Sequence, residues 1–142
     1  MLVQELGGVR VFNESQFWPD GEFSSVLLIA RTDFVENNPK VIRNWIESNE
    51  KTVQWINNNP EQTKKIYSEF LTNYMGKTLP DEIINESFSN LIITSDPLKK
   101  SVYTFAERAD SLGYLGRAGY DINEIFYEYD TSLIPSEENQ NG

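Results

Sequence analysis

The fold prediction starts from an eight-residue stretch that reads Ser24-Ser25-Val26-Leu27-Leu28-Ile29-Ala30-Arg31. Its middle is apolar and lacks the alternation of a strand that has one face in water. A run of this kind is typical of a strand covered on both faces, as in a parallel sheet flanked by helices. The stretch therefore predicts a buried strand in an α/β fold.

A polar loop and a shorter apolar run precede this stretch. The loop covers residues 13–23 and contains the turn signal Trp18-Pro19-Asp20-Gly21, in which proline fixes φ and glycine permits a positive φ. Residues 9–12 form a weaker strand candidate, and residues 91–94 a short extended one. The rest of the chain after residue 31 has helical patterns, so a long helical segment follows very few strands.

Prolines mark the starts of these helices. A capping side chain stands before a proline at Asn38-Pro39, Asn59-Pro60 and Asp96-Pro97, which is the favoured arrangement at a first helical position. Pro80 lacks the cap but is followed by an acidic first turn. Apolar residues recur at spacings of three and four, including Trp45 and Trp55, which we interpret as core residues. The pattern predicts helices over residues 39–58, 60–75, 80–91 and 97–112.

Composition excludes several classes of function. The 142 residues fit one domain, and the net charge of −10 argues against a nucleic-acid partner, because phosphate binding needs a basic surface. The chain has no cysteine and no histidine, so thiolate metal sites and Ser-His or Cys-His catalytic arrangements are absent. No EF-hand spacing occurs. We therefore expect no enzyme activity, no catalytic residues, no cofactor and no metal.

The first residues give an expectation about location. Residues 1–6 have no basic segment and no long apolar run, so they do not read as a signal peptide. No stretch approaches the roughly 18 apolar residues of a membrane-spanning helix. The sequence predicts either a cytosolic product or a piece from the interior of a longer protein.

Six short motifs follow one another in a fixed order along residues 7–130. They are Gly7-Gly8-Val9-Arg10-Val11, the stretch 24–31, Phe34-Val35-Glu36-Asn37-Asn38-Pro39-Lys40-Val41-Ile42, Val53-Gln54-Trp55-Ile56-Asn57-Asn58-Asn59-Pro60-Glu61, Gly76-Lys77-Thr78-Leu79-Pro80 and Asp96-Pro97-Leu98. In this order the chain resembles the C-terminal part of solute-binding proteins of the nitrate, taurine and aliphatic-sulfonate class, which serve ABC importers. Those proteins are extracytoplasmic.

The resemblance implies a type-2 periplasmic-binding-protein fold, here a few strands followed by four or more helices. Residues 1–31 would be the crossing between the lobes, and residues 32–134 a helical segment packed on an N-terminal lobe that this chain does not contain. Residues 135–142 would be a disordered tail. The implied partners are a membrane permease and a small anionic solute, bound only with the missing half. A homodimer or domain swap of the piece is a further expectation.

The resemblance places Trp18, Ser24 and Ser25 at the cleft and hinge. Hydroxyl and indole N–H groups donate hydrogen bonds to nitrate, sulfonate or carboxylate oxygens. The alternative is a surface loop in which Trp18 is a packing anchor. For the whole chain, the alternative is a free-standing helical interaction module. Enzymes of related fold are disfavoured because the histidine that the resemblance implies for them is absent here.

Overall fold

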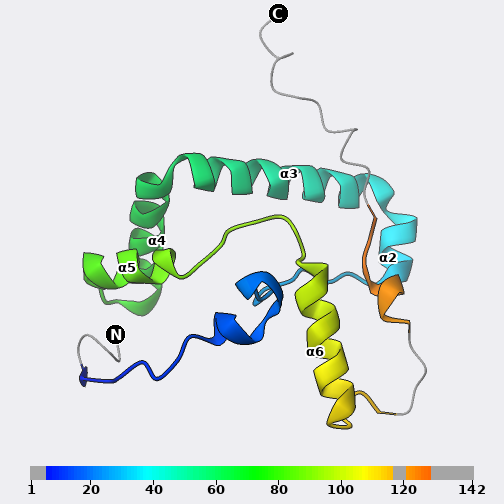
Figure 1. Ribbon diagram of the computed structural model, residues 1–142. Helices are drawn as coiled ribbons and strands as arrows, with labels where there is room; N and C mark the ends of the chain where they lie inside the picture. The colour runs from blue at the N-terminus through cyan, green and yellow to red at the C-terminus, as the bar shows by residue number, and fades with distance from the viewer. Residues whose placement is uncertain (1–5, 117–120, 129–142) are drawn as a thin grey trace, which may run out of the picture. The chain divides into compact units, whose positions relative to one another are not determined.

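The computed structural model describes residues 6–116 and 121–128, and these residues are helical throughout wherever they are regular (Figure 1). The order of elements is η1 (Glu14–Phe17), η2 (Pro19–Gly21), α2 (Thr32–Asn37), α3 (Pro39–Asn58), α4 (Pro60–Met75), α5 (Asp81–Ser89), α6 (Lys99–Ser111) and η3 (Ile122–Ile125). The tail expected over residues 135–142 lies outside the described residues.

The α/β prediction is wrong, because no β-strand occurs in residues 6–116 or 121–128. Residues 22–31 contain no helix, turn or bend, and Val26 and Ile29 are each 88% exposed. Within the described chain, no hydrogen bond uses the backbone of residues 25–30. The segment has the composition of a strand, but a strand exists only where a second strand accepts and donates its ladder hydrogen bonds.

The proline-marked helices are confirmed, since α3 and α4 have the bounds expected for them. Their asparagines act differently from the prediction. The Nδ2 atoms of Asn38 and Asn59 donate to the carbonyls of Phe34 at 3.0 Å and Trp55 at 2.8 Å, four residues earlier. Each asparagine therefore satisfies a carbonyl at the end of the preceding helix instead of capping the next one.

Helix α6 begins two residues later than expected. Leu98 has φ 52° and ψ 57°, a left-handed conformation that costs a residue with a Cβ roughly 1–2 kcal/mol. Two side chains help to hold it: the Leu98 N–H donates to Asp96 Oδ1 at 2.8 Å, and the Ser101 hydroxyl donates to the Leu98 carbonyl at 2.9 Å. The helix therefore starts at Lys99.

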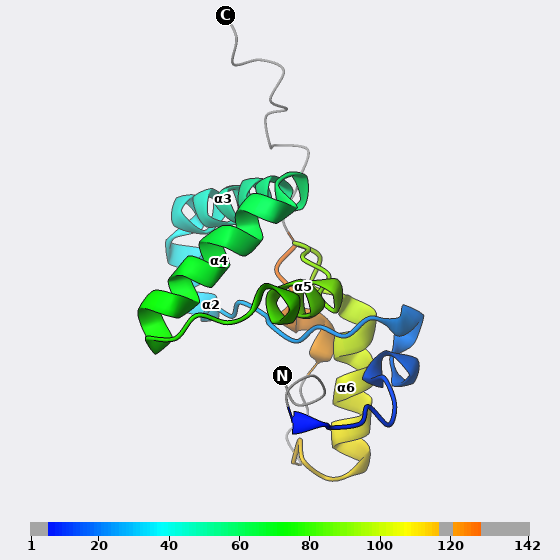
Figure 2. The ribbon, with the colours of Figure 1, turned by 90° about the vertical axis from the view of Figure 1, so that its left-hand side faces the viewer.

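The chain divides into two compact units, each built from two segments far apart in sequence. Unit 1 comprises residues 1–14 and 49–95, and unit 2 comprises residues 15–48 and 96–142. In unit 1, α4 and α5 pack against each other, and the connection that follows Gly76 joins them (Figure 2). Ile83 and Ile84 are its buried apolar side chains, 7% and 4% exposed, and Tyr67 meets Phe88 edge to face at 5.5 Å.

Unit 2 is organised around α6, which receives a different segment on each of two faces (Figure 1). One face contacts the loop of residues 17–24 through Ser101, Phe105 and Arg108. On the other face, Tyr103 meets Phe126 edge to face at 5.5 Å. Ser101, Phe105 and Arg108 are four and three residues apart, which explains why they share a side of α6.

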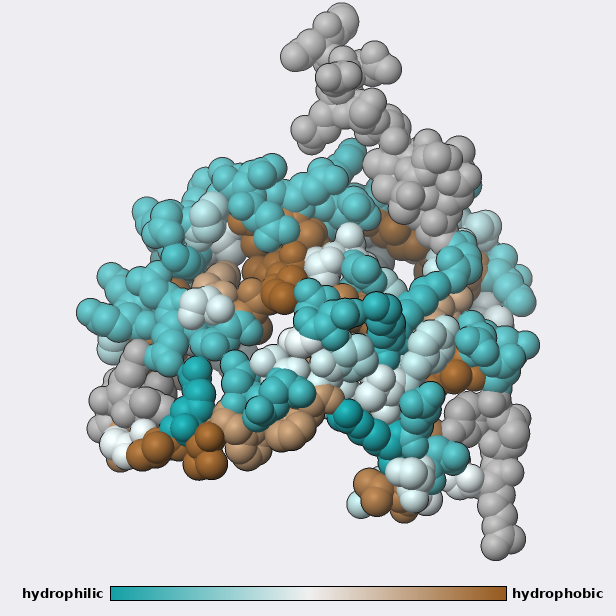
Figure 3. Space-filling view, in the orientation of Figure 1, coloured by the Kyte–Doolittle hydropathy of each residue, from teal (hydrophilic) through white to brown (hydrophobic). Residues whose placement is uncertain are grey.

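Many large apolar side chains in the described residues stay at the surface, where Figure 3 shows them in brown. Trp45 and Trp55, expected as core residues, are 45% and 40% exposed. The helices carry apolar stripes, but a stripe is buried only where another layer covers it. Across the described segments, no helix combines the length and apolar character needed to cross a bilayer.

Replacing Gly76 with alanine is expected to weaken the last turn of α4 by about 1 kcal/mol. Gly76 is the C-cap of α4 with φ 68°, a conformation disfavoured for residues with a Cβ. No atom lies within 4 Å of an added Cβ, so the cost is conformational and not a clash. Amide hydrogen exchange at residues 73–75 measures it, and unchanged exchange there would contradict the left-handed cap.

Candidate functional site

Trp18 is a half-buried packing anchor on α6. Its ring lies 4.3 Å from the Phe23 ring and 6.4 Å from the Phe105 ring, between ring centroids. The Arg108 guanidinium lies over the indole at 4.7 Å, and Arg108 also donates to the carbonyl of Phe17. A cation over an indole face is electrostatically favourable. The packing role weighed for Trp18 is therefore present.

Ser24 also reaches α6, one turn from Phe105. Its backbone N–H donates to the Ser101 hydroxyl at 3.1 Å, and Ser101 is 2% exposed. That hydroxyl in turn donates to the Leu98 carbonyl. Ser25 makes no such contact in the described chain. The structure thus brings Trp18 and Ser24 to one face of α6, and it does not bring Ser25 there.

Two cations of α6 flank these residues, and the sequence prediction missed both. Besides Arg108, the Lys100 ammonium forms an ion pair with Asp20 at 2.8 Å. The hydrogen bond to Asp20, and then the attraction between the charges, raises the pKa of Lys100 above its ordinary value. The ammonium therefore stays charged at neutral pH, and the pair weakens only as the pH rises above the usual range of lysine.

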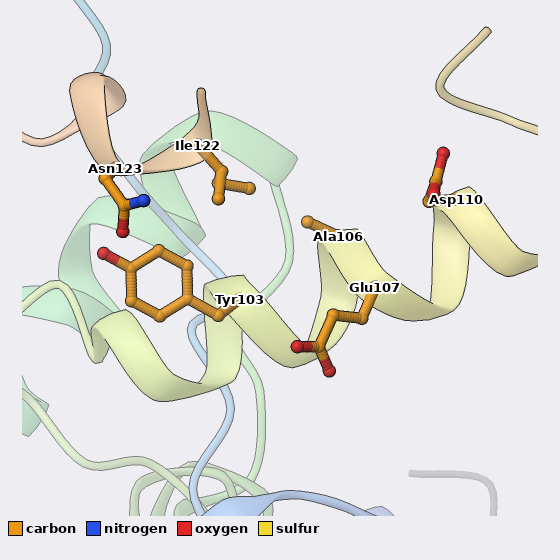
Figure 4. Close-up of a pocket in the computed structure, with 6 residues that line it drawn as sticks. All are labelled: Tyr103, Ala106, Glu107, Asp110, Ile122 and Asn123. Atoms are coloured by element: carbon orange, nitrogen blue, oxygen red, sulfur yellow. The ribbon is translucent and has the colours of Figure 1, made fainter. Parts of the chain in front are cut away.

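The other face of α6 carries an open hollow of about 390 Å³, lined by Tyr103, Ala106, Glu107, Asp110, Ile122 and Asn123. In Figure 4 the Tyr103 hydroxyl lies toward Asn123, while the carboxylates of Glu107 and Asp110 extend in different directions from the helix. The lining residues include no cation to oppose these carboxylates. The hollow is therefore unsuited to an anionic ligand.

Spacing along α6 offered a signal for the missed residues. Ser101, Phe105 and Arg108 are four and three residues apart and share a face of the helix, which the sequence alone can show. Lys100, which precedes Ser101, does not follow this spacing. The segment that packs there lies some eighty to ninety residues earlier in the chain, as the contacts of Ser101 to Ser24 and of Arg108 to Phe17 show. No local pattern identifies such a partner.

Among the described residues, no group of three or more acidic, histidine or cysteine side chains is placed to hold a metal ion. Around Trp18, the geometry brings together an indole ring, the Arg108 guanidinium and the Lys100–Asp20 ion pair. Comparison of the chain with protein-family models, with curated proteins and with solved structures gave no match.

Proposed function

We propose that this chain is part of the solute-binding component of an ABC importer for a small anionic solute, such as nitrate, taurine or an aliphatic sulfonate. The observation that carries the proposal is the Arg108 guanidinium over Trp18, which forms no ion pair with other described residues, together with the Lys100 ammonium that pairs with Asp20. Arg108 and Lys100 stand there in a chain whose net charge is −10. A local cluster of cations attracts an anion in spite of the global charge.

The extended segment of residues 24–31 supports the need for a further polypeptide. It follows Trp18 and Ser24 directly, with unused backbone donors and acceptors and with Val26 and Ile29 each 88% exposed. Uncovered apolar surface next to a charged site is typical of an interaction surface. We propose that the covering polypeptide supplies the rest of the solute site, and that the assembled component delivers the solute to a membrane permease.

The test is a nitrate titration of the ¹⁵N-labelled chain at constant ionic strength, with chloride as the exchanged anion. The indole N–H signal of Trp18 should shift with millimolar affinity, while those of Trp45 and Trp55 serve as internal references. Replacing Arg108 with glutamine should weaken this affinity about tenfold, because a charge-assisted contact is lost. Replacing Arg43, an exposed arginine of α3, should leave it unchanged.

Three results would overturn the proposal. A Trp18 signal that does not shift with nitrate would show that no anion binds beside it. Equal effects of Arg108→Gln and Arg43→Gln on the nitrate affinity would show that Arg108 does not bind the anion. Micromolar binding of taurine, nitrate or an alkanesulfonate by the chain alone, measured by calorimetry, would show that no further polypeptide is needed to complete the site.

A free-standing helical interaction module is the second candidate, and the absence of strands from the described residues favours it. Its binding surface would be an exposed helix stripe, such as that of α4, where Phe70 and Tyr74 stack at 6.0 Å and are 59% and 80% exposed. Stability distinguishes the two candidates. A monodisperse monomer that melts cooperatively supports the module, and an associating or partly molten chain supports the solute-binding component.

A further inference from the structure

Unit 1 contains a small hollow of its own. Its volume is about 280 Å³, below the roughly 300–1,000 Å³ of pockets for drug-sized ligands. Three helices and one extended segment form its wall: the end of α3, the start of α4, the second half of α5 and residues 91–93. The Asn57 amide donates to the Ile93 carbonyl at 3.0 Å and so joins α3 to the extended segment.

About half of the wall is apolar. This part is formed by Ile56, Pro60, Phe88, Leu91 and Ile93. The edge-to-face contact with Tyr67 at 5.5 Å fixes the Phe88 ring, so this part of the wall is preorganised. A wall of this kind stabilises a short alkyl or aryl group by removing it from water.

Most polar groups at the hollow are already occupied. The Thr63 hydroxyl donates to the Asn59 carbonyl at 2.9 Å, and the Ser89 hydroxyl donates to the Glu86 carbonyl at 2.8 Å. The Asn57 amide is held by Ile93, as described above. Two groups have donors left: the Asn85 amide, which forms no hydrogen bond with other described residues, and the Lys64 ammonium, which uses one of its three N–H donors on Glu61.

Lys64 is placed unlike an ordinary surface lysine. Its side chain is 24% exposed, the lowest value in the five ion pairs of the described residues. Its partner Glu61, at 2.7 Å and 84% exposed, does not line the hollow. Because the Glu61 carboxylate is largely in solvent, another anion can replace it at Lys64 at a small cost in free energy. No carboxylate lines the hollow to oppose such an anion.

We infer that this hollow binds a small amphipathic monoanion: a carboxylate or sulfonate with a short alkyl or aryl group. The anionic head bonds to the Lys64 ammonium and accepts from the Asn85 amide, and the apolar group lies against Ile56, Phe88 and Ile93. The ligand displaces the Glu61 carboxylate into solvent. All of these residues belong to unit 1, whereas Trp18, Ser24 and Arg108 belong to unit 2, so the inference does not depend on the proposed function.

Hexanoate and hexane-1-sulfonate are the probes, titrated into the full chain while the methyl signals of Ile56 and Ile93 are followed by NMR. Both should shift these signals. Hexan-1-ol and hexylammonium, which have the same alkyl group without the negative charge, should bind at least about tenfold more weakly. Acetate, which lacks the apolar group, should bind weakly as well.

Three variants test the roles assigned to Lys64 and Glu61. Lys64→Gln should weaken hexanoate binding by about tenfold or more, because a charge-assisted hydrogen bond is lost. Glu61→Gln should strengthen it by about two- to fivefold, because the competing carboxylate is removed. Lys65→Gln, which changes the same charge on the exposed neighbouring residue of α4, should have no effect. Circular dichroism checks that each variant keeps its helices.

The inference is overturned if neither anion shifts the Ile56 and Ile93 signals, or if hexan-1-ol binds as tightly as hexanoate. It is also overturned if Lys64→Gln and Lys65→Gln weaken binding equally. These outcomes are independent of the nitrate titration, which follows the Trp18 indole in unit 2. Failure of one site therefore leaves the other to be judged separately.

Discussion

Replacing Ile84 with alanine is expected to destabilise unit 1 by about 3 kcal/mol, the usual cost of removing a buried isoleucine side chain to Cβ. Ile84 is 4% exposed, and with Ile83 it forms the buried apolar part of the described chain. A loss of this size is a large fraction of the 5–15 kcal/mol that stabilises an ordinary domain. Unit 1 should therefore lose the packing of α4 on α5.

The measurement is amide hydrogen exchange across α4 and α5, together with the NMR chemical shifts of the Tyr67 and Phe88 rings, which depend on their edge-to-face contact. The matched control is Ile92→Ala, which makes the same chemical change in unit 1 at a side chain that is 67% exposed. Its effect should stay within about 0.5 kcal/mol. Equal losses for the two variants would show that Ile84 is not a core residue.

Replacing Val26 and Ile29 together with threonine is expected to reduce self-association of the chain by about 100-fold or more. Each side chain is 88% exposed, and burying one such side chain in an interface contributes roughly 1.5–3 kcal/mol. Threonine keeps the branch at Cβ and puts a hydroxyl in place of a methyl group of Val26 and of the ethyl group of Ile29. Sedimentation velocity at several chain concentrations measures the association directly.

The control is the double variant Val9→Thr and Val11→Thr. These valines are 84% and 86% exposed, but they lie outside the segment of residues 24–31. Association that falls equally in both double variants would mean that exposed apolar surface in general drives it. A wild-type chain that remains monomeric at high concentration would exclude the segment as an association surface.

The helices could be predicted from the sequence because their signals are local. A proline at the first position and an apolar stripe lie within the helix itself, which is why the bounds of α3 and α4 agree with the prediction. The strand prediction failed because the signal for a strand is not local. Residues 24–31 have strand composition, but a ladder requires a second segment, and no local pattern reports whether that segment exists.

Only some residues of the candidate site could be identified from the sequence. Trp18 and Ser24 were identified as residues of interest, and both contact α6. Arg108 and Lys100 were missed because their contacts with Trp18 and Asp20 join distant parts of the chain. The late start of α6 was missed as well, since it depends on the left-handed backbone of Leu98.

The division of each unit into two distant segments has a consequence for folding kinetics. The contacts that close the units join Arg10 to Glu86, Ser24 to Ser101 and Phe17 to Arg108, 76, 77 and 91 residues apart. Individual helices form within about a microsecond, whereas contacts of high sequence separation must first overcome the entropy of closing a long loop. During synthesis, the segment of residues 17–24 must wait for α6 to leave the ribosome. The contacts that close each unit should therefore form after the individual helices.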